Sequence, residues 1–360
     1  MKEKKFYVVA YYPIKIPFSV KRKYFKMNNF EKLIEIGRKV DPIMIHYLEK
    51  NADEAFIPIV KHQILAGGKR IRAALTLISC EAVGGKMEDA LLPAAAIELT
   101  HNYSLIIDDI IDRGEIRRGF QTVRAKYGDV LAILAGIFYR ETIADIINDC
   151  QNSKKINELI IETIKEIIDG ERFDVLFEQA GRLDRYIIEH RYKHVPLELY
   201  YKMIGKKTAT LIKSSCIVGA ISANASKSDL EMLSEFGWKI GLAFQLIDDF
   251  LDIYGEETGK QRGKDIIEHK LGNIVILHAI EEMDNKNKEE LLNILRSEVV
   301  SNEKLRFALR LIDGTNAKNK TLNEAYNLID SAKKAISKLK DSKAKNQLIE
   351  IADFIVKRVY

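Results

Sequence analysis

The chain has 360 residues, of which 47% are hydrophobic and 30% are charged, and its formal net charge is +5. This composition provides enough apolar residues for a sizeable core and excludes a wholly disordered chain. The surplus of positive charge is too small to indicate a nucleic-acid partner, and no apolar run approaches the roughly 18–20 residues that a transmembrane segment requires. Three widely spaced cysteines, Cys80, Cys150 and Cys216, favour a reducing compartment, so we expect a cytoplasmic protein.

The first 26 residues differ in pattern from the rest of the chain. They contain a basic start, an aromatic-rich stretch with Pro13 and Pro17, and a second basic run at 21–23. A secretory signal would have an uninterrupted apolar centre, which this stretch lacks. We interpret residues 1–26 as an N-terminal extension, without deciding whether it belongs to the native protein, and residues 27–360 as one domain.

From Met27 onward the sequence has the pattern of long amphipathic helices. Apolar residues recur at spacings of three and four, as they do at Phe236, Ile240, Phe244, Ile247 and Leu251. Proline, which interrupts helices, is absent after Pro196, and no stretch alternates polar and apolar residues as a strand would. Ser228 followed by Glu231 predicts the capping box of one helix. The sequence therefore predicts an all-α fold in a single large bundle.

An aspartate motif, D-D-x-x-D, occurs twice in the chain. The first copy is Asp108, Asp109 and Asp112, and the second is Asp248, Asp249 and Asp252. On a helix the first and last aspartates of each copy share one face, where their like charges repel. Apolar neighbours would bury these charges, so the carboxylates require a cation, and oxygen ligands without a nearby His or Cys favour Mg²⁺. The repetition argues against two solvated helix ends, and we expect both copies to face one hollow.

Cationic side chains accompany both copies of the motif. These residues, with one neighbouring threonine, are Lys69, Arg70, Arg72, Arg117, Arg118, Lys207, Thr208, Lys260, Lys264 and Lys270. Arginine binds phosphate through a planar fork of donors and lysine binds it as a point charge. Each cluster alone is typical of a solvated surface, but together with the aspartates they predict a pocket for a phosphate–metal complex.

These motifs make the chain similar to the trans-isoprenyl diphosphate synthases, the family of farnesyl and geranylgeranyl diphosphate synthases. The likeness rests on GGKRIR at 67–72, HNYSLIIDDIIDRGEIRRG at 101–119, the Lys207-Thr208 pair, and FQLIDDFLD at 244–252 followed by GKD at 263–265. The resemblance implies an all-α bundle around a central cavity. It also implies a prenyltransferase, usually a homodimer with a heterodimer possible, that joins isopentenyl diphosphate to an allylic diphosphate.

The resemblance also implies a role for each matching residue. More than one Mg²⁺ ion would be bound by Asp108, Asp112 and Asp248, with Asp109, Asp249 and Asp252 assisting. The allylic diphosphate would be held by Arg117, Lys207, Thr208, Gln245, Lys260 and Lys270, and isopentenyl diphosphate by Lys69, Arg72, His101 and Arg118. Asp108, Asp112, Asp248, Lys207 and Arg117 would then be the catalytic residues, because they stabilise the departing diphosphate. Helix periodicity supports two of these roles, since it places Gln245 on the face of Asp248 and His101 on the face of Asp108.

Product length is expected to depend on what blocks the cavity below the first motif. Tyr103 lies five residues before Asp108, about 7.5 Å along a helix axis, and its neighbours Thr100 and Ser104 are small. In similar short-chain enzymes a single aromatic at this place accompanies a C20 product. Our hypothesis is therefore geranylgeranyl diphosphate, and the alternative is that Tyr103 is an ordinary core residue.

Three positions depart from the pattern of the family. Ile107 stands where a His is usual, Ile137 where an Asp is usual, and Glu171 where a Gln is usual. These changes leave open an altered rate or product, or a non-catalytic or partner-dependent subunit of a heteromeric synthase, although the chain keeps all six aspartates. A class I terpene cyclase is the other alternative, and it would need neither GGKRIR nor His101.

Overall fold

The structure is a computed structural model that describes residues 27–255 and 262–358. The first half contains α1 (Met27–Arg38), α2 (Asp41–Glu49), α3 (Ile57–Leu65), α4 (Ile71–Ala82), η1 (Met87–Ala90), α5 (Leu91–Ile111), β1 (Ile116–Arg117), β2 (Phe120–Gln121), α6 (Val123–Tyr127), α7 (Asp129–Asn148) and α8 (Ser153–Phe177). The second half contains α9 (Arg185–His190), α10 (Leu197–Ile204), η2 (Gly205–Ala209), α11 (Thr210–Ser222), α12 (Lys227–Tyr254), α13 (Lys264–Ile267), α14 (Ile274–Glu282), α15 (Asn285–Leu295), α16 (Asn302–Asp313), α17 (Ala317–Ala335) and α18 (Lys343–Lys357). The expected extension, residues 1–26, lies outside the described residues.

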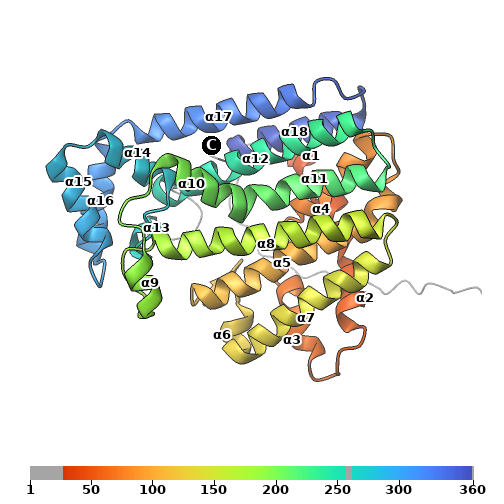
Figure 1. Ribbon diagram of the computed structural model, residues 1–360, viewed down its shortest axis with the longest axis horizontal. Helices are drawn as coiled ribbons and strands as arrows, with labels where there is room; N and C mark the ends of the chain where they lie inside the picture. Colours follow the sequence, from red (N-terminus) through yellow and green to blue (C-terminus); the bar gives the residue numbers. More distant parts are fainter. Residues whose placement is uncertain (1–26, 256–261, 359–360) are drawn as a thin grey trace, which may run out of the picture.

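The helices form one bundle, which confirms the predicted all-α fold. The long helices α8, α11, α12 and α17 run along the long axis of the molecule, and α12 packs against both α11 and α17 (Figure 1). Helix α5 packs on α7. Helix α11 lies between this pair and α12, because it contacts α4, α5 and α8 as well as α12. The described part of the chain has one small departure from the all-α prediction, the antiparallel hairpin of β1 and β2.

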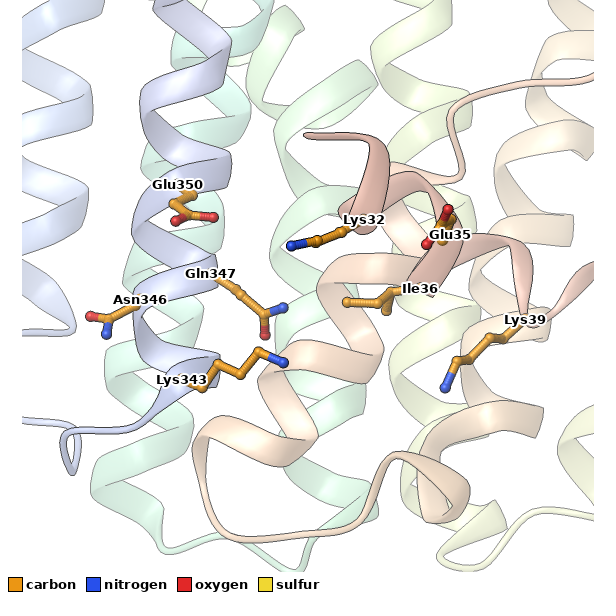
Figure 2. Close-up of a pocket in the computed structure, with 8 residues that line it drawn as sticks. All are labelled: Lys32, Glu35, Ile36, Lys39, Lys343, Asn346, Gln347 and Glu350. Carbon is orange, nitrogen blue, oxygen red and sulfur yellow. The ribbon is translucent and has the colours of Figure 1, made fainter. Parts of the chain in front are cut away.

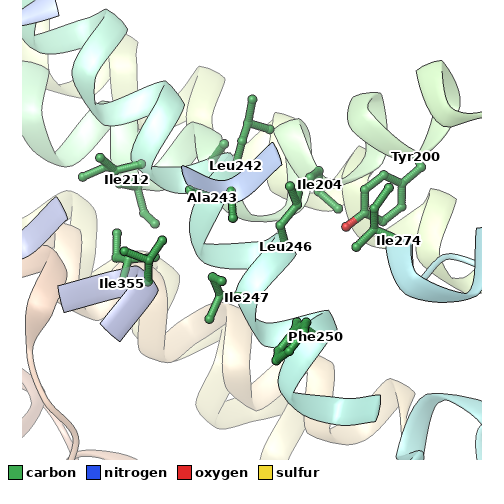
Figure 3. Close-up of a cluster of buried hydrophobic side chains, with 14 of the residues drawn as sticks. Tyr200, Ile204, Ile212, Leu242, Ala243, Leu246, Ile247, Phe250, Ile274 and Ile355 are labelled. Carbon is green, nitrogen blue, oxygen red and sulfur yellow. The ribbon is translucent and has the colours of Figure 1, made fainter. Parts of the chain in front are cut away.

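The packing of α12 follows from its sequence periodicity. Phe236, Ile240 and Ile247 are fully buried. Figure 3 shows its inner residues meeting side chains from α10, α11, α14 and α18, among them Tyr200 and Ile355. Burial of such apolar surface stabilises the fold by about 25 cal/mol per Å². Of the five residues in the predicted pattern, the three fully buried ones enter the core, whereas Phe244 and Leu251 are only partly buried.

The start of α12 differs from the predicted capping box. Ser226, not Ser228, is the N-cap, and its hydroxyl accepts a hydrogen bond from the Asp229 amide at 3.1 Å. Both serines precede an acidic residue by three positions, so the local pattern fits either. The left-handed backbone of Asn224, with φ of 51°, turns the chain just before Ser226 and selects the earlier cap.

Candidate functional site

Both aspartate motifs lie at the C-terminal ends of long helices. Helix α5 ends at Ile111, with Asp112 as its cap residue, and α12 ends at Tyr254, just after Asp252. The last carbonyl groups of a helix have no partner within the helix, and the helix dipole places partial negative charge there. Carboxylates at such ends are unfavourable unless cations gather around them.

Cations do surround the first motif. Arg117, which the β-hairpin carries, donates to both oxygens of Asp109 at 2.9 and 3.0 Å and to Asp108 at 2.9 Å. Lys270 Nζ lies 3.3 Å from Asp112 Oδ2. Burial alone would raise the pKa of Asp108, but the charges of Lys207 and Arg117 hold this pKa below its ordinary value. Cationic side chains of the protein therefore offset part of the negative charge of the first motif, whereas burial still raises the pKa of Asp109.

Lys207 lies in a cage of three carboxylates. Its Nζ is 2.6 Å from Asp174, 2.8 Å from Glu171 and 3.5 Å from Asp108. Lys207 belongs to η2, a π-helical turn, and such turns are frequent at functional sites. Close approach of α8 requires Gly170, since a Cβ there would lie 2.3 Å from the Lys207 backbone nitrogen. Although burial acts to lower the pKa of Lys207, the carboxylates raise it well above the ordinary value.

Glu171, one of the three departures from the family pattern, is therefore part of this cage. One of its carboxylate oxygens, Oε1, is buried and has no hydrogen-bond partner. Burial is the main reason that the pKa of Glu171 is raised to about 7, and the nearby carboxylates of Asp108 and Asp174 add to the effect of burial, against the pull of Lys207. The side chain adds a carboxyl group to a crowded acidic cluster.

The second motif is satisfied mainly by neutral donors. Asp249 accepts hydrogen bonds from the Tyr200 hydroxyl at 2.7 Å, the Gln245 amide at 2.8 Å and the Ile274 backbone at 3.0 Å. Burial raises the pKa of Asp249 well above its ordinary value, and burial together with Asp265 raises that of Asp252 to about 8. Both carboxyls therefore hold a proton more readily than a free aspartate does.

Asp248, the remaining aspartate of the second motif, has a cationic partner from the far end of the chain. Its Oδ1 lies 2.7 Å from Nη1 of Arg358, which follows α18. The guanidinium also lies over the Phe244 ring, 4.9 Å from its centroid. The end of the described chain therefore reaches the second motif.

The two motifs share a common set of neighbours. Lys207 contacts Asp108 of the first motif, while the adjacent Thr208 donates to Gln245 at 2.8 Å, and Gln245 in turn donates to Asp249. Gln245 thus bonds to Asp249, the second aspartate of its motif. Consecutive residues of one turn link both motifs, so α5 and α12 present their carboxylates to the same region.

The donor set suits Mg²⁺ shared with a phosphate ligand. Among residues 27–255 and 262–358, no group of three His, Cys, Asp or Glu side chains is arranged to bind a metal ion unaided. Mg²⁺ is usually bound by one or two carboxylates, waters and substrate phosphates, and it seldom needs an all-protein cage. The aspartates and the surrounding cations fit that mode of binding.

A second group of cations lies at the GGKRIR loop. The Arg118 guanidinium donates to the Gly67 carbonyl and abuts Gly68, where a Cβ would lie 2.7 Å from Arg118 Nη1. Nε of Arg72 is buried without a hydrogen-bond partner. Burial, then the charges of Arg72 and Arg118, lowers the pKa of His101 well below its ordinary value, so this imidazole is neutral. A cluster of buried cations with one unpartnered donor, Arg72 Nε, suits an anion.

Lys69 and Arg70, the other two cations of that loop, differ in their contacts. Lys69 lies 5.5 Å from the ring centroids of both Phe30 and Phe354, and burial together with Arg358 lowers its pKa. Arg70 instead pairs with Asp41 at 2.7 Å and is 3% exposed, which is a structural role. Lys69 therefore retains its donors for a ligand, whereas Arg70 does not.

Of the remaining predicted residues, three lie on α5 and Lys264 begins α13. Thr100 and Ser104 bond to backbone carbonyls of their own helix, and Tyr103 is half-buried against the apolar cluster between α5 and α7. Lys264 pairs with Glu268 at 2.8 Å, and Lys260 lies outside the described residues. These facts leave the proposed roles of Tyr103 and Lys260 untested.

A groove of 540 Å³ lies elsewhere, between α1 and α18 (Figure 2). The residues that line it are Lys32, Glu35, Ile36, Lys39, Lys343, Asn346, Gln347 and Glu350. They combine three lysines with two glutamates and include no residue of either motif. The groove is therefore separate from the site that the sequence predicts.

The fold and the site define an all-α protein that collects carboxylates and phosphate-binding cations at two helix ends. The family model described as polyprenyl synthetase matches residues 54–312. A short chain isoprenyl diphosphate synthase from Methanothermobacter thermautotrophicus is 38% identical over 311 residues, which cover 85% of this chain and 91% of that protein. The chain therefore belongs to the polyprenyl synthetase family, the trans-isoprenyl diphosphate synthases, and is a prenyltransferase.

Solved structures agree with this assignment. The crystal structure of geranylgeranyl pyrophosphate synthetase from Pyrococcus horikoshii Ot3 has a TM-score of 0.83 and 32% identity, covering 92% of this chain and 98% of that one. Polyprenyl synthase from Caulobacter crescentus CB15, complexed with calcium and isoprenyl diphosphate, has a TM-score of 0.82 and 28% identity, covering 94% and 100%. The comparisons favour neither the cyclase nor the non-catalytic subunit.

A stability measurement tests the position of Glu171. A carboxyl whose pKa rises on folding stabilises the folded state below its unfolded pKa, near 4.5, and this stabilisation is lost as the pH rises through about 7. Glutamine does not titrate, so the Glu171→Gln variant should gain roughly 1–3 kcal/mol relative to the wild type between pH 5 and pH 8. Urea unfolding in EDTA at the two pH values measures this difference.

Glu162, an exposed residue of the same helix, provides the matched control. The Glu162→Gln variant should keep the wild-type dependence of stability on pH. If the Glu171→Gln variant also keeps the wild-type dependence of stability on pH, the prediction that the pKa of Glu171 is raised is wrong.

Proposed function

We propose that this prenyltransferase joins isopentenyl diphosphate to an allylic diphosphate in a Mg²⁺-dependent reaction, and that its main product is the C20 geranylgeranyl diphosphate. The observation that carries the proposal is a pair of adjacent anion sites. One consists of the aspartate motifs with Arg117, Lys207 and Lys270. The other is the basic cluster around Arg72 and the neutral His101, in which Arg72 Nε has no hydrogen-bond partner. A reaction between two diphosphate esters requires two such sites.

The allylic diphosphate would occupy the site between the motifs. Bound Mg²⁺, held by Asp108, Asp112 and Asp248, would offset the charge that builds on the leaving diphosphate. Arg117 and Lys207 lie against the same carboxylates and would donate directly to that diphosphate. The allylic C–O bond breaks with its electron pair on the diphosphate.

The second diphosphate would occupy the basic cluster. Lys69, Arg72 and Arg118 would pair with isopentenyl diphosphate, and the neutral His101 would donate one hydrogen bond. The double bond of this substrate attacks the allylic carbon, and a proton then leaves to the released diphosphate. No protein nucleophile is required.

A second copy of the chain is the proposed partner. Helix α7 exposes Val130, Ile133, Leu134 and Ile137, by 71%, 45%, 48% and 56%. Their spacing of i, i+3, i+4 and i+7 forms one apolar stripe, and no element of the described chain covers it. An exposed apolar face of this kind marks an interaction surface, and a two-fold pairing of identical faces would bury it.

The cytoplasm remains the proposed location. All three cysteines are free and buried, which suits a reducing compartment. Among the described residues, none of the helices has the length and apolarity needed to cross a membrane.

Incubation of the purified chain with isopentenyl diphosphate and each allylic starter (C5, C10 and C15) tests the activity. With Mg²⁺ the wild type should elongate the starters mainly to C20, and with EDTA it should not. Chromatography of the dephosphorylated products measures chain length. Absence of elongation by the chain alone would support a partner-dependent subunit, and release of hydrocarbons would support a cyclase.

Tyr103 is proposed as the floor that stops elongation at C20. The Tyr103→Ala variant should shift the main product beyond C20, because a longer chain then fits below Asp108. Tyr103→Phe keeps the ring and should keep the wild-type product. An unchanged distribution in the alanine variant would mean that Tyr103 is an ordinary packing residue.

The apolar stripe of α7 is tested at Ile137, its last residue. Ile137→Glu places a charge in the proposed interface. Light scattering should therefore show the mass of a monomer for this variant and the mass of a dimer for the wild type. Val299, 72% exposed and outside the stripe, provides the control Val299→Glu, which should remain dimeric. A dimeric Ile137→Glu variant would contradict this interface.

A further inference from the structure

Arg182 is a cation near the first aspartate motif, and the sequence analysis did not single it out. It lies in the connection between α8 and α9, and its side chain is 17% exposed. Its guanidinium donates from Nε to Glu178 Oε2 at 2.6 Å and from Nη2 to Glu178 Oε1 at 2.7 Å. This two-point pairing fixes the plane of the guanidinium.

The same guanidinium binds the end of α5. Nη1 donates to the Ile111 carbonyl at 2.5 Å, and Nη2 lies 3.4 Å from Asp112 Oδ1. The amides that follow α5 bond to the carbonyls of other residues, Asp108, Asp109 and Ile110. Arg182 thus supplies the Ile111 carbonyl with a partner, and its positive charge faces the negative end of the helix dipole.

Glu178, the anchor of Arg182, is itself fixed to the segment that carries Lys270. Glu178 and Lys270 form a backbone bridge, and the amide of Gln179 donates to the His269 carbonyl at 2.9 Å. Lys270 Nζ lies 3.3 Å from the other oxygen of Asp112, Oδ2. Both oxygens of Asp112 are therefore contacted from one connected structure.

These contacts orient Asp112 without saturating it. Charge-assisted hydrogen bonds are usually about 2.7–2.9 Å long, whereas Asp112 lies 3.4 Å from Arg182 and 3.3 Å from Lys270. The short bonds of Arg182 go instead to Glu178 and the Ile111 carbonyl. Asp112 is held in place while its oxygens remain able to accept a cation.

We propose that Arg182 is a positioning residue for Asp112: it anchors the end of α5 and orients this carboxylate toward the shared metal and diphosphate. The proposal rests on the proposed function of the site. Partners that orient a metal ligand typically change metal affinity by 10–100-fold when they are removed. Arg182 therefore acts on the affinity for Mg²⁺ and not on the chemical step.

The test compares Arg182→Gln, Arg182→Lys and a matched control, Arg185→Gln. Arg185 is three residues away, its side chain is 91% exposed, and it pairs with Glu189 on the surface. The Mg²⁺ concentration that gives half-maximal prenyl transfer should rise at least tenfold in both Arg182 variants, because lysine cannot reproduce the fork. Turnover at saturating Mg²⁺ should stay within about threefold of the wild type, and Arg185→Gln should not change.

Calorimetry of Mg²⁺ binding in the presence of inorganic diphosphate gives a second readout that needs no turnover. Weaker binding by Arg182→Gln supports the positioning role even if the wild type proves inactive in prenyl transfer, in which case only the proposed function fails. The proposal is overturned if Arg182→Gln leaves the Mg²⁺ affinity unchanged or if Arg185→Gln lowers this affinity equally. It is also overturned if the Arg182 variants reduce turnover without changing the affinity for Mg²⁺. A wild type that binds no Mg²⁺ with diphosphate overturns both proposals.

Discussion

The site depends on acidic side chains being held at the C-terminal ends of two long helices, which is the least favourable place for them. The helix dipole and the unpaired carbonyls already make these ends negative. Burial of Asp108, Asp249 and Asp252 increases the cost further. The surrounding segments supply the compensating charge: a β-hairpin carries Arg117, and a π-helical turn carries Lys207.

The two helix ends are compensated in different ways. Around α5, Arg117, Lys207 and Lys270 supply positive charge, and the charges of Lys207 and Arg117 hold the pKa of Asp108 below its ordinary value. Around α12, neutral donors satisfy Asp249, and burial keeps the pKa of its carboxyl high. Asp248, the first aspartate of the second motif, is instead paired with the cationic Arg358.

Sequence reasoning was most informative about residues that are related by local spacing. The i, i+4 spacing placed the first and last aspartates of each motif on one helix face, but only the structure showed that both motifs lie at helix ends. The adjacent Lys207 and Thr208 connect the two motifs. It failed where two local patterns compete, as at Ser226 and Ser228, because both satisfy the same capping rule. Glu171 was noticed as a departure, but its contact with Lys207 exists only because α8 and η2 approach at Gly170.

By itself the sequence determined the helical periods, the composition of the core and the types of ligand available, because helix geometry relates residues three and four positions apart. Only the tertiary structure decided which cation meets which carboxylate. Arg182 reaches Asp112 across 70 positions, and Arg358 reaches Asp248 from the end of α18. Such contacts are set by how whole helices pack against one another, and no local spacing of residues encodes that packing.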